Sequence, residues 1–337
     1  MVGMEQNNGA PAGGMNNPKR SLFDQPRKVI SGIVFSGTIV GMVLISLVFS
    51  ITLGLISSLS DTPVGELQET DAYKYFSYLL YQIVYVGIIV AFAAIYKSRP
   101  RDFGYRKVKV RYLFIALALA FGLLFSLNWV NGWFVEFLEL LGYKPPYMDY
   151  PGLTEREYAL QYQLPSLAGA GFFGVLLVVA VLPALCEETI FRGIILDGVK
   201  DIGTVAACLL GGLLFSIFHQ SPTQTIYQFI CGAAFTLLAI RADSIWPAIL
   251  IHFVNNAVII FDYKFDFLSK VSSGGAIAIY VISAVCLAAS LIYLIFFDKK
   301  TNRKKEGAIK PFVYPALVGI ILCAIMWIAN FASGMMG

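Results

Sequence analysis

The chain has 337 residues, of which 58% are hydrophobic and only 14% are charged, and its mean hydropathy is +0.71. A soluble domain is nearer to about 45–50% apolar and about 25% charged. This chain therefore has too little polar surface for an ordinary soluble protein, a disordered protein or a nucleic-acid binder. We predict an all-α polytopic membrane helix bundle with about 8–9 transmembrane helices.

Residues 1–28 are rich in Asn, Gly and Pro, so we expect a disordered cytoplasmic tail. Long apolar segments follow, each near the ~20 residues that span a bilayer, although the fifth and sixth are short. The first is too long for a signal-peptide core. The segments cover residues 30–58, 75–96, 112–135, 168–196, 204–219, 224–240, 244–262, 275–297 and 312–333.

The basic residues are unevenly distributed among the connecting segments. Of 25 Lys and Arg residues, seven lie between residues 97 and 111 and six between 298 and 311. Cytoplasmic loops carry such an excess, so we predict that the N-terminus is cytoplasmic. The Pro- and Tyr-rich loop 134–165 would then lie on the outer side, with a short surface helix.

Ionisable side chains deep inside the apolar segments are confined to three of the predicted helices. These side chains are Glu187, Glu188, Arg192, His219 and His252, and the chain has no other histidine. A charge at bilayer depth costs at least ~2.5–3.5 kcal/mol on insertion scales. We therefore expect these residues to form a functional site.

Helix geometry gives the two glutamates different neighbours. Glu188 and Arg192 are four residues apart, so they share a helix face and can form an ion pair. Glu187 is rotated by about 100° and has Phe191 at its own i+4 position. A buried carboxylate without a partner is strongly destabilising, so another helix or water must satisfy Glu187.

The remaining polar groups of the neighbouring helices are the candidates for that role. They are His219, His252 and Asn256, the last lying four residues after His252 and on the same face. At a rise of 1.5 Å per residue, His219 comes out about two turns deeper than the other groups. The expected set is thus a carboxylate, two imidazoles and an amide.

This set suits hydrolysis of a carbonyl compound. A carboxylate beside an imidazole can activate a water as general base, and an amide with a second imidazole can donate to an oxyanion. Two histidines and a glutamate could instead bind zinc, although neither histidine belongs to an H-E-x-x-H motif. We predict no cofactor, with zinc as the alternative and Glu187, His219 and His252 as its ligands.

Three motifs resemble those of the CAAX protease and bacteriocin-processing (CPBP, or Abi) family of intramembrane proteases. Residues 187–192 (EETIFR) are similar to E-E-x-x-x-R, residues 215–219 (FSIFH) to F-x-x-x-H, and residues 252–256 (HFVNN) to H-x-x-x-N. They occur in the order of the family, each on a predicted helix.

The resemblance implies an intramembrane CAAX-type endopeptidase, of the glutamate type or a metalloprotease, acting on membrane-associated or lipidated peptides. It would make Glu187 the general base with His219, and would make His252 and Asn256 the oxyanion ligands. Glu188 and Arg192 would support the site.

The resemblance also divides the chain into parts. Residues 165–262 would form the catalytic core, between the N-terminal transmembrane helices with the outer loop (29–164) and the C-terminal transmembrane helices (263–337).

Other functions are also considered. Some bacterial members of the family resemble immunity or scaffold proteins that bind a partner without proteolysis, which is the main alternative. A transporter would explain buried charges but not the Glu, His and Asn combination. We expect a multi-pass protein of a bacterial plasma membrane whose partners are the lipid bilayer and a prenylated-protein-like peptide. A membrane-protein partner is left open.

Overall fold

The computed structural model describes residues 25–299 and 301–336, and within these ranges the chain is helical with no strand. The predicted all-α fold is therefore confirmed. The predicted disordered tail falls almost entirely on residues 1–24, which lie outside the described residues. The nearest approach to a sheet in the described part is an isolated antiparallel bridge between Ile202 and Lys305.

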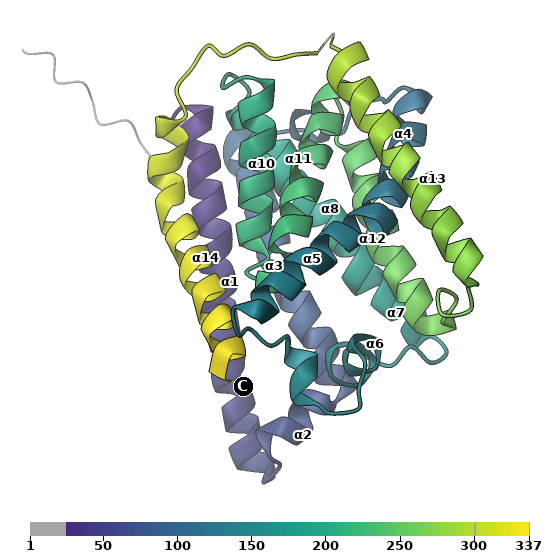
Figure 1. The fold of residues 1–337 in the computed structure, drawn as a ribbon. Coiled ribbons are helices and arrows are strands. Elements are labelled where there is room, and N and C mark those ends of the chain that lie inside the picture. Colours follow the sequence, from purple (N-terminus) through teal and green to yellow (C-terminus); the bar gives the residue numbers. More distant parts are fainter. Residues whose placement is uncertain (1–24, 300, 337) are drawn as a thin grey trace, which may run out of the picture.

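The elements follow one another with short connections (Figure 1). The α-helices are α1 (Arg27–Ser60), α2 (Val64–Glu69), α3 (Asp71–Tyr96), α4 (Val110–Gly122), α5 (Asn128–Leu140), α6 (Glu155–Tyr158), α7 (Gly171–Val175), α8 (Leu182–Glu188), α9 (Leu196–Gly198), α10 (Thr204–Phe218), α11 (Thr225–Ala242), α12 (Trp246–Phe265), α13 (Ser273–Ile292) and α14 (Lys310–Met336). The π turns are η3 (Leu123–Leu127), η5 (Ala159–Gln163), η6 (Leu176–Val181), η7 (Thr189–Ile195) and η9 (Tyr293–Phe297), and the 3₁₀ turns are η2 (Pro100–Phe103), η4 (Pro146–Asp149) and η8 (Pro222–Gln224).

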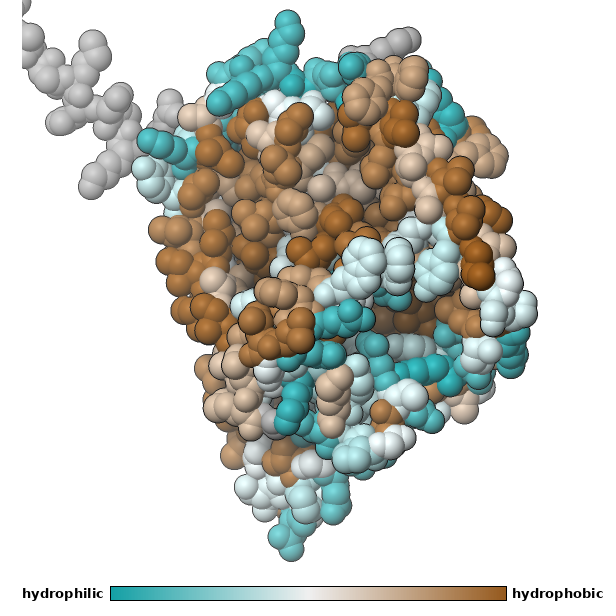
Figure 2. Space-filling model, viewed as in Figure 1, coloured by the Kyte–Doolittle hydropathy of each residue, from teal (hydrophilic) through white to brown (hydrophobic). Residues whose placement is uncertain are grey.

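Eight helical stretches in the described residues are long and apolar enough to cross a membrane. The remaining apolar segment is α10, which has only 15 residues. At 1.5 Å per residue it reaches about 22 Å, less than the ~30 Å of a hydrocarbon core. The chain is thus an integral, multi-pass membrane protein whose surface carries a broad apolar region (Figure 2).

The third expected helix is bent rather than straight. It begins as α4, passes through the π turn η3 and continues as α5, which runs obliquely across the molecule in Figure 1. Below α5, Figure 2 shows a hollow with a largely hydrophilic rim and a hydrophobic floor. The expected short helix in loop 134–165 is present as α6, accompanied by η4 and η5.

The basic loops gather at one end of the bundle, where α1 begins. Lys28 pairs with Asp201 at 2.7 Å, and the backbone N–H of Thr204 donates to the Arg303 carbonyl at 3.0 Å. The Ser244 hydroxyl donates to the Arg106 carbonyl, which joins loop 97–109 to the same end. α14 ends at the opposite end, so its C-terminal residues are far from the start of α1 (Figure 1).

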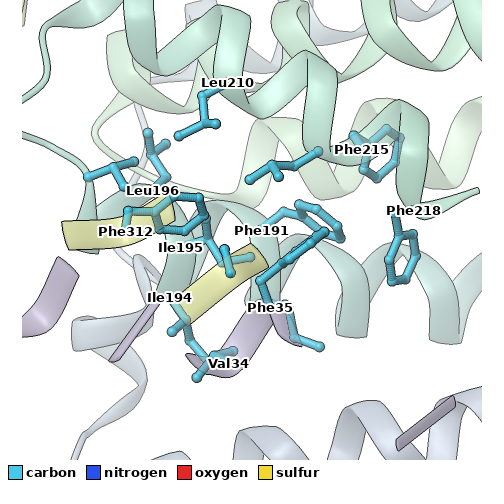
Figure 3. Close-up of a cluster of buried hydrophobic side chains, with 14 of the residues drawn as sticks. Val34, Phe35, Phe191, Ile194, Ile195, Leu196, Leu210, Phe215, Phe218 and Phe312 are labelled. Carbon is cyan, nitrogen blue, oxygen red and sulfur yellow. The ribbon is translucent and has the colours of Figure 1, made fainter. Parts of the chain in front are cut away.

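A core of aromatic residues packs around the π turn η7. The ring of Phe191 contacts Phe215 at 5.3 Å, Phe218 at 5.0 Å and Phe35 at 6.5 Å between centroids, each edge to face (Figure 3). Phe35 belongs to α1, whereas Phe215 and Phe218 belong to α10. These contacts hold the segment with the E-E-x-x-x-R motif between two helices distant in sequence.

Candidate active site

The two glutamates lie in the middle of a continuous helical stretch, Gly171–Gly198. α8 carries both of them and is flanked by the π turns η6 and η7. Pro183, at the start of α8, has no N–H to donate to the preceding turn, which suits the wider turn before it. Single π turns within helices are frequent at functional sites.

Glu188 and Arg192 form a buried ion pair. The Arg192 Nη1 donates to Glu188 Oε1 at 2.9 Å, and both side chains are at most 1% exposed. The Arg192 Nη2 donates to the Gly232 carbonyl of α11 at 2.9 Å. Arg192 thereby connects the glutamate helix to α11.

His252 of α12 is held by the same glutamate. Its Nδ1 lies 3.0 Å from Glu188 Oε1. A carboxylate only accepts hydrogen bonds, so Nδ1 carries the proton and the Nε2 of a neutral ring has a free lone pair. The rings of Phe215 and Phe235 lie 5.9 and 6.1 Å from the imidazole, which gives the site apolar walls.

Glu187 is buried, with 8% of its surface exposed, and its Oε2 has no hydrogen-bond partner in the described structure. The His252 Nε2 lies 4.0 Å from this oxygen. That distance is too long for a direct hydrogen bond and suits a bridging water. The unpaired carboxylate expected from helix geometry is therefore present.

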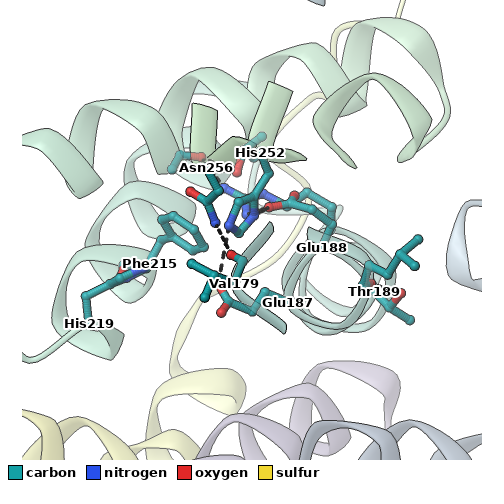
Figure 4. Close-up of polar contacts among 12 residues, drawn as sticks. Val179, Glu187, Glu188, Thr189, Phe215, His219, His252 and Asn256 are labelled. Atoms are coloured by element: carbon teal, nitrogen blue, oxygen red, sulfur yellow. Dashed lines mark hydrogen bonds and ion pairs between the residues drawn. The ribbon is translucent and has the colours of Figure 1, made fainter. Parts of the chain in front are cut away.

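His219 occupies a different position from the one expected. α10 ends at Phe218, and the His219 Nδ1–H donates back to the Phe215 carbonyl at 2.7 Å. No hydrogen bond or ion pair joins His219 to Glu187 in the described part of the chain. Figure 4 shows the Phe215 ring between His219 and the other site residues. His252, rather than His219, is thus the imidazole in ion-pair range of Glu187.

Asn256 lies beside His252 on α12, as the four-residue spacing predicts (Figure 4). Its Nδ2 donates to the Val179 carbonyl of η6 at 2.9 Å. Val179 belongs to the π turn η6. The amide that was expected to bind an oxyanion therefore has a protein acceptor in this structure.

Several contributors to the site could not be found from the sequence. Two are main-chain carbonyls, those of Val179 and Gly232, which any residue could supply. A third is Tyr105, whose hydroxyl lies 2.6 Å from that of Thr189, next to Glu188 in the chain. Tyr105 comes from a polar loop without a motif, so its sequence carries no signal of proximity.

The donor set does not converge on a single point that a metal ion could occupy. No group of three or more His, Cys, Asp or Glu side chains in the described residues is arranged to hold one. The His252 Nδ1 and the His219 Nδ1 both carry protons toward protein acceptors. The zinc alternative would need His219 and Glu187 to move together.

Fold and site together define a polytopic membrane protein with a buried, unpaired carboxylate beside an imidazole. Residues 169–258 match a family model described as Rce1-like, type II CAAX prenyl endopeptidase Rce1-like. The three motifs lie within this range, and the match confirms the resemblance to the CAAX protease and bacteriocin-processing family. Residues 169–258 are thus similar to a CAAX-type endopeptidase domain. Comparison with curated proteins and with solved structures gave no match.

Proposed function

We propose that the protein is an intramembrane endopeptidase in which Glu187 activates a water that hydrolyses a peptide bond. The observation that carries the proposal is the unpaired Oε2 of Glu187, 4.0 Å from the His252 Nε2. A buried carboxylate without a partner is costly, so its retention within an apolar bundle favours a catalytic role.

A water between these two atoms would be well oriented for attack. Both the ionised Glu187 carboxylate and the neutral His252 Nε2 are hydrogen-bond acceptors. The water would donate one hydrogen to each, which leaves its lone pairs directed away from them. A scissile carbonyl carbon approaching that side would meet the nucleophile.

The reaction then follows from proton transfers at these atoms. The water oxygen bonds to the carbonyl carbon while Glu187 takes a proton, and the carbonyl oxygen becomes an oxyanion. We assign Asn256 as its donor, after its Nδ2 leaves the Val179 carbonyl. The C–N bond breaks as the amine nitrogen receives the proton that Glu187 took from the water.

The other motif residues support this arrangement. Arg192 is the cation that pairs with Glu188, and Glu188 orients His252 by accepting a hydrogen bond from its Nδ1–H. The Nε2 of His219 makes no hydrogen bond in the described structure, and we assign it the role of accepting a hydrogen bond from the substrate backbone. These roles differ from the first expectation, in which His219 assisted Glu187 and His252 bound the oxyanion.

The substrate that fits is a membrane-associated or lipidated peptide. The bilayer concentrates an apolar substrate around the helices, and the matched family description concerns prenyl endopeptidases. We therefore propose a prenylated-protein-like substrate in a bacterial plasma membrane. If the chain is instead a scaffold or immunity protein, it would bind a membrane-protein partner in place of a peptide substrate.

The test is cleavage of a farnesylated CAAX-type reporter peptide by purified protein in liposomes. The wild type is compared with Glu187→Gln and with Glu66→Gln, a control that removes an exposed carboxylate in α2. We expect cleavage by the wild type and Glu66→Gln, and none by a folded Glu187→Gln variant. Full activity of Glu187→Gln excludes the general-base role. Wild-type protein inactive on all lipidated peptides favours the scaffold alternative.

The proposed mechanism uses no metal ion, and a second assay checks this. Activity should survive exhaustive chelation, because each proposed step is performed by protein side chains and water. One zinc per chain by elemental analysis, with activity lost on removal and restored on return, contradicts this mechanism. It would make Glu187, His219 and His252 metal ligands.

A further inference from the structure

A second polar site lies at the end of the bundle where the basic loops gather. It is a cavity of about 200 Å³. A water takes about 30 Å³ of liquid, so the space holds several waters or a phosphate-sized group. Its lining comprises Asp102, Gly104, Arg106, Arg192, Gly193, Leu196, Asp197, Lys200, Ala239, Asp243, Ser244, Ile245 and Arg303.

The carboxylates of this lining already have partners. Asp243 pairs with Arg106, and Asp197 lies 3.4 Å from the Lys200 ammonium. Asp102 accepts from the backbone N–H of Arg99 at 2.8 Å. Asp243 and Asp197 are therefore paired with cations of the same lining, and Asp102 accepts from a neutral backbone N–H.

Two arginines have donors that these carboxylates do not use. The Arg303 guanidinium makes one described hydrogen bond, from Nη1 to the Leu196 carbonyl at 3.2 Å, and no described carboxylate lies within 4.0 Å of it. Burial lowers the pKa of this guanidinium. Arg192 is 4% exposed, and its Nε has no partner in the described structure.

We propose that this cavity binds a phosphate group, presented by the headgroup of an acidic phospholipid or by a free phosphate ion. Arg303 holds the group at the opening, and Arg192 Nε is the donor at the inner wall. Arginine forks match phosphate oxygens in geometry and charge. Basic pockets between membrane helices at the cytoplasmic side bind anionic headgroups for the same reason. This site is separate from the peptide-hydrolysing atoms, although Arg192 contributes to both.

Binding is measured on purified full-length protein in a nonionic detergent, by native mass spectrometry and by thermal shift. The ligands are phosphatidylglycerol, phosphatidylcholine and inorganic phosphate, the last against sodium chloride at equal ionic strength. We expect stabilisation by phosphatidylglycerol or inorganic phosphate and none by chloride. Stabilisation by the lipid alone identifies a headgroup, and stabilisation by phosphate alone identifies the free ion.

Variants that are expected to change the affinity in opposite directions distinguish binding in the cavity from non-specific attraction to surface charge. Arg303→Gln should weaken binding at least tenfold, and Arg303→Lys should retain part of it. Asp243→Asn removes a negative charge from the lining and should tighten binding severalfold; Asn also tolerates the left-handed backbone there (φ 49°). Lys304→Gln, an exposed neighbour outside the lining, is the control and should stay within twofold.

Three results overturn the proposal. One is the absence of binding by any of the phosphate ligands. Another is an equal loss of binding affinity in the Arg303→Gln and Lys304→Gln variants. The third is weaker binding by a folded Asp243→Asn variant. If Arg303→Gln does not fold, Arg303→Lys and Asp243→Asn decide the question alone.

Discussion

Arg192 uses its guanidinium to join three parts of the site. It pairs with Glu188, donates to the Gly232 carbonyl of α11, and lies 4.6 Å from the centre of the Phe215 ring. Because the Glu188 carboxylate also holds His252, one cation positions the imidazole of the proposed water site. Its removal should therefore affect folding as well as catalysis.

Arg192→Ala leaves Glu188 without its cation in a medium of low dielectric. We expect a loss of about 3–5 kcal/mol of stability, the usual cost of breaking a buried ion pair. Thermal unfolding in detergent measures it, with Arg101→Ala at an exposed loop position as the control. An unchanged melting temperature with lost activity would mean that Arg192 contacts substrate instead.

Substitution of the two histidines should change the kinetics in different ways. His252→Ala removes the second acceptor of the proposed water and should lower kcat by about 10²–10⁴-fold, the usual contribution of a positioned base. His219→Ala should raise KM more than it lowers kcat, because we assign it to substrate binding. Steady-state kinetics on the lipidated reporter separate the two. The opposite pattern would return His219 to the role of Glu187's partner.

At the scale of elements, glycines let α10 and α11 approach closely. A Cβ on Gly232 would lie 2.7 Å from the Phe215 Cβ and 2.9 Å from the Gly211 carbonyl oxygen. Small residues have this function where membrane helices cross. The close approach brings the Gly232 carbonyl to Arg192 and Phe215 to the site.

Gly232→Ala should separate these helices and destabilise the protein by about 1–3 kcal/mol, the range for overpacking. Activity should fall too, since the Gly232 carbonyl holds Arg192. Gly87→Ala in α3 is the matched control, because nothing lies within 4 Å of a Cβ there. Equal melting temperatures for the two variants would contradict the tight α10–α11 interface.

Hydropathy located the helical segments well but not their local geometry. Each apolar segment is helical, because a bilayer leaves few other ways to satisfy backbone hydrogen bonds. The π turns beside α8 and the bend at η3 depend on packing against neighbouring helices, which a residue-by-residue pattern does not contain. The end of α10 at Phe218 also depends on such packing. His219 follows this end and bonds to its own helix, not to Glu187, in the described part of the chain.

At the scale of the whole molecule, the two loops rich in Arg and Lys lie at the end where α1 begins. They are residues 97–111 and 298–311. We predict that this end is cytoplasmic, following the positive-inside rule. Cysteine introduced for the exposed Lys107 or Lys304 should resist an impermeant thiol reagent in intact cells. Cysteine at the exposed Asp149, near the opposite end, should react. Wild-type protein gives the background of the native cysteines, and reversed labelling would overturn the orientation.

The sequence by itself determined the class of protein and the identity of the candidate residues. An apolar chain must bury its backbone in helices, and charges are retained within them only for a reason, so Glu187, Glu188, Arg192 and His252 could be selected without a structure. Spacing along one helix was enough to pair Glu188 with Arg192, because both groups share one rigid axis.

Only the tertiary structure decided which groups from different helices meet. It brought His252 to both glutamates, turned His219 toward its own helix and gave Asn256 a carbonyl partner. It also formed an open cavity lined by segments that are far apart in the chain. These relations depend on the rotation, tilt and depth of each helix relative to its neighbours. Such quantities are set by side-chain packing across interfaces, so no single segment of sequence encodes them.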